Sequence, residues 1–236
     1  MKILALVPAR GGSKRLPGKN IRLLGGKPMI VWSIGVANGI PEICDLLVTT
    51  DDPAIEAVCK EAGALVPWLR PAELATDTAS SIDVALHALD WYEDTHGLVD
   101  GLMLLQPTSP FRRAETIKQA ISLFLMNGCR PVIGVSPAAS HPAWCYGIEQ
   151  DTLLPYISSG FGDVPHRSQD LPPAYALNGA MYLAEPAYLR KTRAFFGADA
   201  YPLVMENPVE ALDIDTAHDF LVAECIAASM CKTTAG

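Results

Sequence analysis

Residues 3–20 have the sequence ILALVPARGGSKRLPGKN. The first part, residues 3–7, is a short uninterrupted apolar run, typical of a strand buried on both faces at the centre of a parallel sheet. The second part is a loop that combines three glycines with the cations Arg10, Lys14, Arg15 and Lys19. Glycines let a backbone approach a ligand closely, and Lys and Arg neutralise phosphate charge. The stretch therefore predicts a central strand that leads into an anion-binding loop.

Positive charge is concentrated at the amino-terminal end of the chain. The whole sequence is acidic, with 18 Lys and Arg against 26 Asp and Glu, yet seven cations precede the first acid, Glu42. Because solvated surfaces usually mix both signs, this distribution favours an anion site. The spacing matches neither the phosphate loop that ends in Gly-Lys-Ser/Thr nor the Gly-x-Gly-x-x-Gly dinucleotide motif.

Composition narrows the class of protein. A chain of 236 residues, half of them apolar, suits a single domain over 1–236. The sequence has no apolar run near 18 residues and no signal-peptide layout, so we expect no membrane span. Six scattered cysteines without a Cys-x-x-Cys pair predict reduced thiols in the cytoplasm. A net charge of −8 disfavours nucleic-acid binding.

Apolar runs and helical patterns alternate along the chain. Strands are expected at 43–49, 64–67, 101–105, 131–135, 178–183 and 201–205, and helices at 28–39, 53–62, 81–91, 114–126, 186–191 and 217–230. This alternation predicts an α/β fold with a mainly parallel sheet, which binds ligands at the carboxyl ends of its strands. Residues 137–176 break the pattern and are predicted to be an inserted subdomain that forms a dimer contact.

Three polar clusters fall at positions where this fold would place a site. Ser80 and Ser81 precede a helix, where one serine caps it and a helix N-terminus also accepts an anionic ligand. The run QPTSP at 106–110 follows a buried strand. Asp213 and Asp215 flank one apolar residue, so on an extended segment both carboxylates share a face and suit magnesium beside phosphates. The alternative for Asp215 is a cap on the last helix.

Five segments together resemble the acylneuraminate cytidylyltransferases, the CMP-sialic acid synthetases: residues 9–20, 70–81, 105–110, 178–182 and 213–215. They span nearly the whole chain in the family's order. The resemblance implies a three-layer Rossmann-like nucleotidyltransferase fold. It also implies a transferase that joins CTP to a nine-carbon 2-keto sugar acid, releases pyrophosphate and uses Mg²⁺ as cofactor.

The resemblance also implies roles for individual residues. The nucleotide would be bound by Arg10, Gly11, Lys14, Lys19, Asn20, Arg70, Ser80 and Ser81. The sugar acid would be bound by Gln106, Thr108, Ser109, Arg167, Tyr175, Asn178, Phe195 and Phe196, although the Phe pair suits ordinary packing equally well. Asp213 and Asp215 would hold the metal and, with Arg10 and Lys19, form the catalytic group.

Two departures from the family pattern leave the sugar open. Sialic-acid members commonly have a Lys shortly after the His-Pro pair, where this chain has Ala143 and Trp144, and many have a second Arg where Arg167 here stands alone. The sequence therefore resembles synthetases for legionaminic acid as much as those for sialic acid. A CMP-Kdo synthetase and a non-catalytic sugar-nucleotide-binding protein remain the alternatives.

Overall fold

The apolar run forms β1 (Ile3–Pro8) in the computed structural model, which describes residues 1–157, 165 and 167–233. Ile3 to Val7 are completely buried. Ile3, Ala5 and Val7 belong to one hydrophobic core, and Leu4 and Leu6 belong to a second one. Because neighbouring side chains point to opposite faces of a strand, β1 is covered on both faces, as its sequence predicts.

A six-stranded sheet surrounds β1 in the order β10-β6-β9-β5-β1-β4. β4 (Ile43–Thr49) and β5 (Gly101–Leu104) flank β1 in parallel, and β6 (Val132–Pro137) pairs in parallel with β10 (Tyr201–Val204). β9 (Tyr175–Ala184) lies antiparallel between β5 and β6. The mainly parallel sheet is confirmed. The expected strand 64–67 is reduced to an isolated bridge at Leu65, and a second bridge follows at Leu69.

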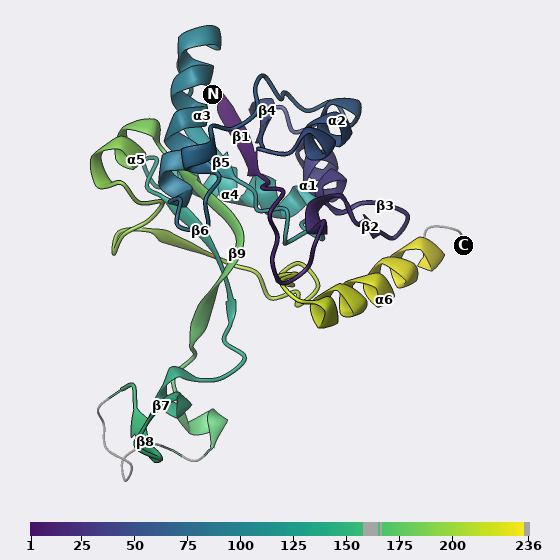
Figure 1. Cartoon of the computed structure of the whole chain (residues 1–236). Coiled ribbons are helices and arrows are strands. Elements are labelled where there is room, and N and C mark those ends of the chain that lie inside the picture. Colours follow the sequence, from purple (N-terminus) through teal and green to yellow (C-terminus); the bar gives the residue numbers. More distant parts are fainter. Residues whose placement is uncertain (158–164, 166, 234–236) are drawn as a thin grey trace.

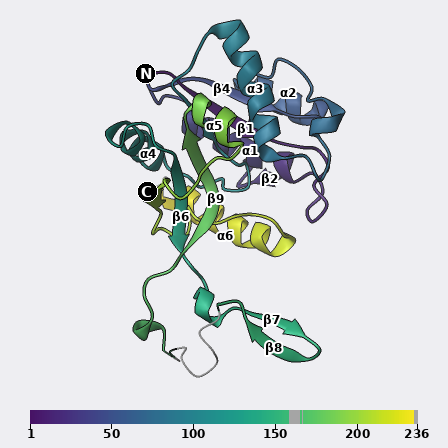
Figure 2. The same cartoon turned by 90° about the vertical axis from the view of Figure 1, so that its left-hand side faces the viewer.

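Helices cover both faces of the sheet and give the fold three layers. On one face lie α1 (Met29–Ala37), α2 (Pro53–Glu61) and α4 (Ala114–Met126), whose apolar side chains join the first core. On the other face lie α3 (Ser81–His96) and α5 (Pro186–Thr192), side by side in Figures 1 and 2. This arrangement is the predicted α/β fold, and none of the described helices is long and apolar enough to cross a membrane.

A third hydrophobic cluster joins the two ends of the chain. It packs α6 (Ala217–Thr233) against the small hairpin of β2 (Leu23–Leu24) and β3 (Lys27–Pro28), as Figure 1 shows. Leu16 from the amino-terminal loop and Ile214 from the segment before α6 are both buried in this cluster. The chain also forms two short 3-10 turns, η1 (Lys19–Ile21) and η2 (Ala72–Leu74).

The inserted region projects from the far ends of β6 and β9 (Figures 1 and 2). It contains the antiparallel hairpin β7 (Tyr146–Glu149) and β8 (Thr152–Pro155), with the turns η3 (Pro142–Trp144) and η4 (Ser168–Asp170). The amide of Ala138 donates to the carbonyl of Ala174 at 2.9 Å and joins its two arms. The predicted limits 137–176 therefore fall at the end of β6 and the start of β9, although 158–164 and 166 lie outside the described residues.

Candidate active site

The candidate site lies where the connections of the sheet diverge. From β1 the chain passes through α1 on one face to reach β4, and it then returns through α3 on the other face to β5. Loops at the carboxyl ends of β1 and β5 therefore separate, which is where open α/β sheets bind ligands. A cavity of about 590 Å³ opens there. It is lined by five cations, two carboxylates and further polar and apolar residues: Arg10, Lys14, Arg15, Lys19, Arg70, Asp77, Asp215, Pro8, Ser13, Leu16, Asn20, Leu74, Thr76, Ala79, Ser81, Val84, Gln106, Pro107 and Thr108.

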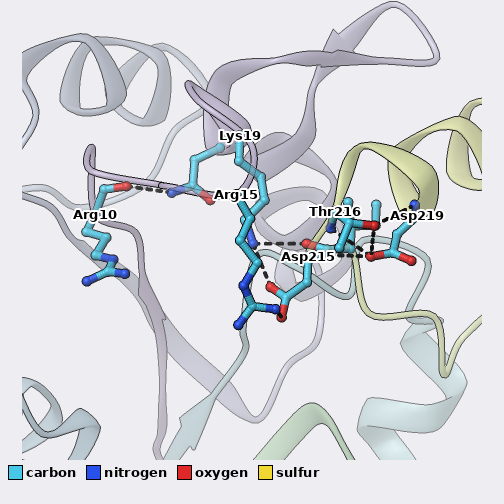
Figure 3. Close-up of polar contacts among 8 residues, drawn as sticks. Arg10, Arg15, Lys19, Asp215, Thr216 and Asp219 are labelled. Carbon is cyan, nitrogen blue, oxygen red and sulfur yellow. Dashed lines mark hydrogen bonds and ion pairs between the residues drawn. The ribbon is translucent and has the colours of Figure 1, made fainter. Parts of the chain in front are cut away.

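Lys19 connects the amino-terminal loop to the carboxyl-terminal segment. Leu16 anchors the loop in the third cluster, and Gly18, at φ +65°, turns the chain into η1. The Lys19 Nζ then donates to the Ile214 carbonyl at 2.9 Å and to Asp215 Oδ1 at 3.0 Å, while Arg15 reaches Asp215 Oδ2 at 3.1 Å (Figure 3). Residues nearly 200 positions apart thus converge on one cavity, as the sequence predicts.

Asp77 forms a second group of ion pairs across the cavity. Its carboxylate accepts from Arg10 Nη1 at 2.8 Å and pairs with the Lys14 ammonium. The Lys14 hydrogen bond, helped by the charges of Lys14 and Arg10, holds the pKa of Asp77 below its usual range. Asp77 stands inside the motif 70–81, but it is absent from the predicted site residues. Only the fold reveals that this carboxylate faces the cation loop.

Two of the predicted nucleotide-binding residues use their polar groups within the protein. The Gly11 amide donates to Asp51 Oδ1 at 3.0 Å, and a Cβ at this position would lie 2.5 Å from Asp52 Oδ2. The buried Asn20 amide donates to the Arg10 carbonyl at 2.9 Å. Both residues therefore set the shape of the loop, and a direct contact of theirs with a nucleotide stays a prediction.

Arg70, Ser80 and Ser81 lie on the α3 side of the site. Arg70 is buried, and its guanidinium donates to the Thr49 hydroxyl at 3.1 Å and to the Thr49 carbonyl. Burial lowers the pKa of Arg70, the charge of Arg10 lowers it further, and Asp51 opposes both. Ser80 caps α3 by accepting from the Ile82 amide at 3.3 Å, while Ser81 lines the cavity. Ser80 is therefore the capping residue, and a contact of either serine with a nucleotide stays a prediction.

The loop after β5 contacts the segment that carries Asp213, although Asp213 itself, unlike Asp215, is not one of the described residues that line the cavity. Gln106 and Thr108 line the cavity, whereas Ser109 is completely buried. The Thr108 carbonyl accepts from the Ile214 amide at 2.8 Å, which holds the Asp213–Asp215 segment against this loop. Burial raises the pKa of Asp213 above its usual range and the Asp215 charge adds to the effect, while Thr108 and Lys19 oppose it.

The carboxylate of Asp215 faces the cavity instead of capping α6. Thr216 and Asp219 cap this helix reciprocally, because the Thr216 amide donates to Asp219 Oδ2 at 2.7 Å and the Asp219 amide donates to the Thr216 hydroxyl at 3.2 Å (Figure 3). Ile214, between the two aspartates, is completely buried. The alternation expected from the sequence is therefore present, and Asp215 is left for the cation loop.

The remaining predicted sugar-binding residues do not line this cavity within the described part of the chain. Arg167 and the exposed Tyr175 lie on the inserted region and its arm. The buried Asn178 bonds the Ala180 amide and Met205. Phe195 and Phe196 pack on Tyr182, with ring centroids 5.6 and 6.1 Å away. Burial raises the pKa of Tyr182, and the charge of Asp213 adds to this effect.

The carboxylates of Asp213 and Asp215 fit a magnesium ion better than a transition metal. No group of three His, Cys, Asp or Glu residues that could hold a metal exists among the described residues. Magnesium is usually bound by one or two carboxylates together with substrate phosphates, and it needs no cage made entirely by the protein. The raised pKa of Asp213 indicates that its ionised form is disfavoured in the folded protein, and a cation beside it would offset this effect.

Comparison with known proteins agrees with this geometry. Residues 4–140 match the family model described as Cytidylyltransferase. The chain is 39% identical to the CMP-N,N'-diacetyllegionaminic acid synthase of Legionella pneumophila, with 95% of each chain covered. It is 34% identical to the N-acylneuraminate cytidylyltransferase of Streptococcus agalactiae over 94% of its own length, but it spans only 52% of that relative. It is 30% identical to the pseudaminic acid cytidylyltransferase of Campylobacter jejuni, with 96% of each covered.

Two solved structures share the fold. The chain superposes on a CMP:2-keto-3-deoxy-manno-octonic acid synthetase complexed with CTP with a TM-score of 0.68, at 18% identity, over 99% of this chain and 100% of the other. It superposes on the 4-diphosphocytidyl-2C-methyl-D-erythritol synthase of Anaerococcus prevotii with a TM-score of 0.63, at 16% identity, over 95% and 97%. These likenesses show the fold alone, a three-layer α/β architecture of the Rossmann-like kind.

Proposed function

Because the chain belongs to the cytidylyltransferase family, we propose that it transfers CMP from CTP to a nonulosonic acid, a nine-carbon 2-keto sugar acid of legionaminic- or sialic-acid type. One observation carries this proposal. Lys19 and Arg15 from the first loop meet Asp215 from the far end of the chain, at a cavity that Arg10, Lys14 and Arg70 also line. Five cations that line one cavity with Asp215, next in the chain but one to Asp213, suit a triphosphate with its magnesium ion.

The chemistry follows from positioning and charge. The anomeric hydroxyl oxygen of the acid attacks the α-phosphorus of CTP, the bond from that phosphorus to the bridging oxygen breaks, and pyrophosphate leaves. Arg10, Lys14 and Lys19 bind the phosphates and neutralise the charge that develops on the leaving group. Arg70 and Ser81 line the nucleoside side, and Gln106 and Thr108 line the acceptor side. The attacking hydroxyl loses its proton as the new bond to phosphorus forms.

Asp213 and Asp215 are the residues that would hold Mg²⁺. When bound, the ion would polarise phosphate oxygens and add to the positive charge around the leaving group. Asp215 pairs with Lys19 and Arg15, so the side chains that would neighbour the ion include a cation that we propose to bind the phosphates, Lys19. This shared position supports the magnesium assignment.

The identity to relatives favours a nonulosonic acid over the eight-carbon acid Kdo. Three relatives whose names refer to legionaminic, acylneuraminic and pseudaminic acids are 30–39% identical, whereas the octonic-acid synthetase is 18% identical and shows the fold alone. The intact cation loop and both late aspartates also disfavour a non-catalytic binding protein. We propose a cytoplasmic location, which the free thiols of the described cysteines support.

Turnover with a panel of acids tests the function. Purified protein is incubated with CTP, Mg²⁺ and one of four acids: N,N'-diacetyllegionaminic, N-acetylneuraminic, pseudaminic or Kdo. Pyrophosphate release and the mass of the CMP-sugar are then measured. We expect turnover with the legionaminic or neuraminic acid, and none when UTP replaces CTP. Turnover with Kdo alone would reassign the substrate. Binding of CTP without turnover of any acid would favour the non-catalytic protein.

We also propose that the inserted region forms a homodimer. Its hairpin and arms expose large apolar side chains, including Ile148 and Tyr156, with 74% and 77% of their surface accessible. Apolar groups gathered on a projecting hairpin are typical of a surface covered by a partner. Light scattering should give about twice the 25.3 kDa mass of one chain, and Ile148→Glu should shift that mass toward the single-chain value. A single-chain mass for the unaltered protein would overturn the dimer.

A further inference from the structure

Arg112 is a buried cation that the proposed chemistry does not use. It stands two residues before α4 and follows the loop 105–110 in the chain, and only 4% of its surface is accessible. No carboxylate lies within ion-pair distance of it in the part of the chain that the structure describes. Burial lowers its pKa to about 9, so the guanidinium is still protonated near neutral pH. A desolvated cation is costly, and this one must be held by other acceptors.

Those acceptors belong to three separate elements. Arg112 Nη1 donates to the Gln106 carbonyl at 2.9 Å and to the Ala180 carbonyl of β9 at 2.8 Å. Its Nη2 donates to the Ser33 hydroxyl of α1 at 2.6 Å. The planar guanidinium presents its donors in a fixed fork, so it sets the distance and orientation between the groups that it joins. Arg112 therefore fixes the loop after β5 relative to β9.

The side chain of Gln106 lies between the two segments that Arg112 joins. Gln106 lines the cavity, and a Cβ added to Gly179 would come within 3.0 Å of Gln106 Oε1. Gly179 has φ +70°, and the next amide, of Ala180, donates to Asn178 Oδ1 at 3.0 Å. The side-chain amide of Gln106 thus lies against the kinked stretch of β9 at Gly179. Arg112 binds the carbonyl of the next residue, Ala180.

We propose that Arg112 is a positioning residue for the acceptor side of the site: it clamps the Gln106 carbonyl to the Ala180 carbonyl and so holds the Gln106 amide in the geometry that receives the sugar acid. This inference rests on the proposed function, because that function assigns the Gln106 wall to the acid. Both carbonyls that Arg112 holds together lie on the acceptor side, its third acceptor is Ser33 of α1, and Arg112 donates to no residue of the cation loop among the bonds of the described chain.

The test compares the effect of a substitution on the sugar acid with its effect on CTP binding. Arg112→Lys keeps a positive charge and loses the fork, so we expect a loss of about 10- to 100-fold in kcat/KM for the sugar acid. The dissociation constant of CTP, measured by calorimetry, should change by less than about twofold because the cation loop is untouched. The matched control is Arg130→Lys, whose guanidinium also donates to a carbonyl, that of Asp199, but beside β10. It should leave both constants unchanged.

Hydrogen exchange gives a readout that does not need turnover. In Arg112→Lys, amides of 105–110 and 178–181 should exchange at least about tenfold faster, with those of 9–20 unchanged. Equal losses for CTP and acid, or unchanged constants together with unchanged exchange, would overturn the proposal. If the unaltered protein turns over no acid, the proposed function fails, and exchange alone decides whether Arg112 clamps the two segments.

A second variant decides the matter if Arg112→Lys does not fold. Gly179→Ala places a methyl group against Gln106 Oε1 and leaves Arg112 intact. As for Arg112→Lys, we expect a reduced kcat/KM for the sugar acid and an unchanged dissociation constant for CTP. A Gly179→Ala protein with full activity toward the acid would contradict it.

Discussion

Asp213→Asn is expected to reduce kcat by roughly 100- to 1,000-fold while the protein stays folded, because a preorganised charge at the reacting phosphate is removed. The same change should leave the melting temperature equal or higher at neutral pH. The pKa of Asp213 is raised chiefly by burial, so the folded protein disfavours the ionised carboxylate. A neutral amide of the same shape removes that unfavourable charge. Steady-state pyrophosphate release and thermal unfolding of the two proteins check both expectations.

Asp219→Asn is the matched control for this substitution. Asp219 stands six residues later and caps α6 through the Thr216 amide and hydroxyl. Loss of its charge should lower the melting temperature and reduce kcat far less than Asp213→Asn does. If Asp213→Asn retains full activity, the metal role of this carboxylate is refuted.

The fold could be predicted largely from local patterns. The apolar run 3–7 and the predicted helix 114–126 both match elements of the structure, because burial on one or both faces imposes a period that a sequence displays. The direction of β9 was not predictable in this way. Its antiparallel course between β5 and β6 depends on the long inserted region that reverses the chain. The short run 64–67 lacks enough neighbours to form a full strand.

The candidate site was predictable in its location and less so in its detail. The cations of the first loop and Asp215 converge because each follows an element whose end is fixed by the sheet or the third cluster. The internal bonds of Gly11 and the ion pairs of Asp77 join residues at least 40 positions apart. No local pattern encodes such pairings, so the loop's supporting carboxylates emerge only from the folded chain.

Lys19→Met is expected to weaken CTP binding by about 10- to 100-fold, the effect of losing charge-assisted hydrogen bonds in a shielded site. The Lys19 side chain is only 12% accessible, and its ammonium is fixed between the Ile214 carbonyl and Asp215. A cation held in advance at this place binds phosphate without further ordering. Calorimetry with CTP and with CMP provides the measurement. The loss of affinity should be larger for CTP than for CMP, because we propose that Lys19 binds the triphosphate.

Comparison of Arg15→Met with Lys19→Met separates the effect of a shielded position from the effect of positive charge alone. Arg15 pairs with the same carboxylate, but 70% of its side chain is accessible, so water and salt screen it. Its loss should weaken CTP binding less than about fivefold, an effect that 0.5 M salt should remove. Equal losses from the two substitutions would mean that net charge alone attracts the nucleotide. Equal weakening of CTP and CMP by Lys19→Met would remove Lys19 from the β- and γ-phosphates, which CMP lacks, and with it the role of Lys19 at the leaving group.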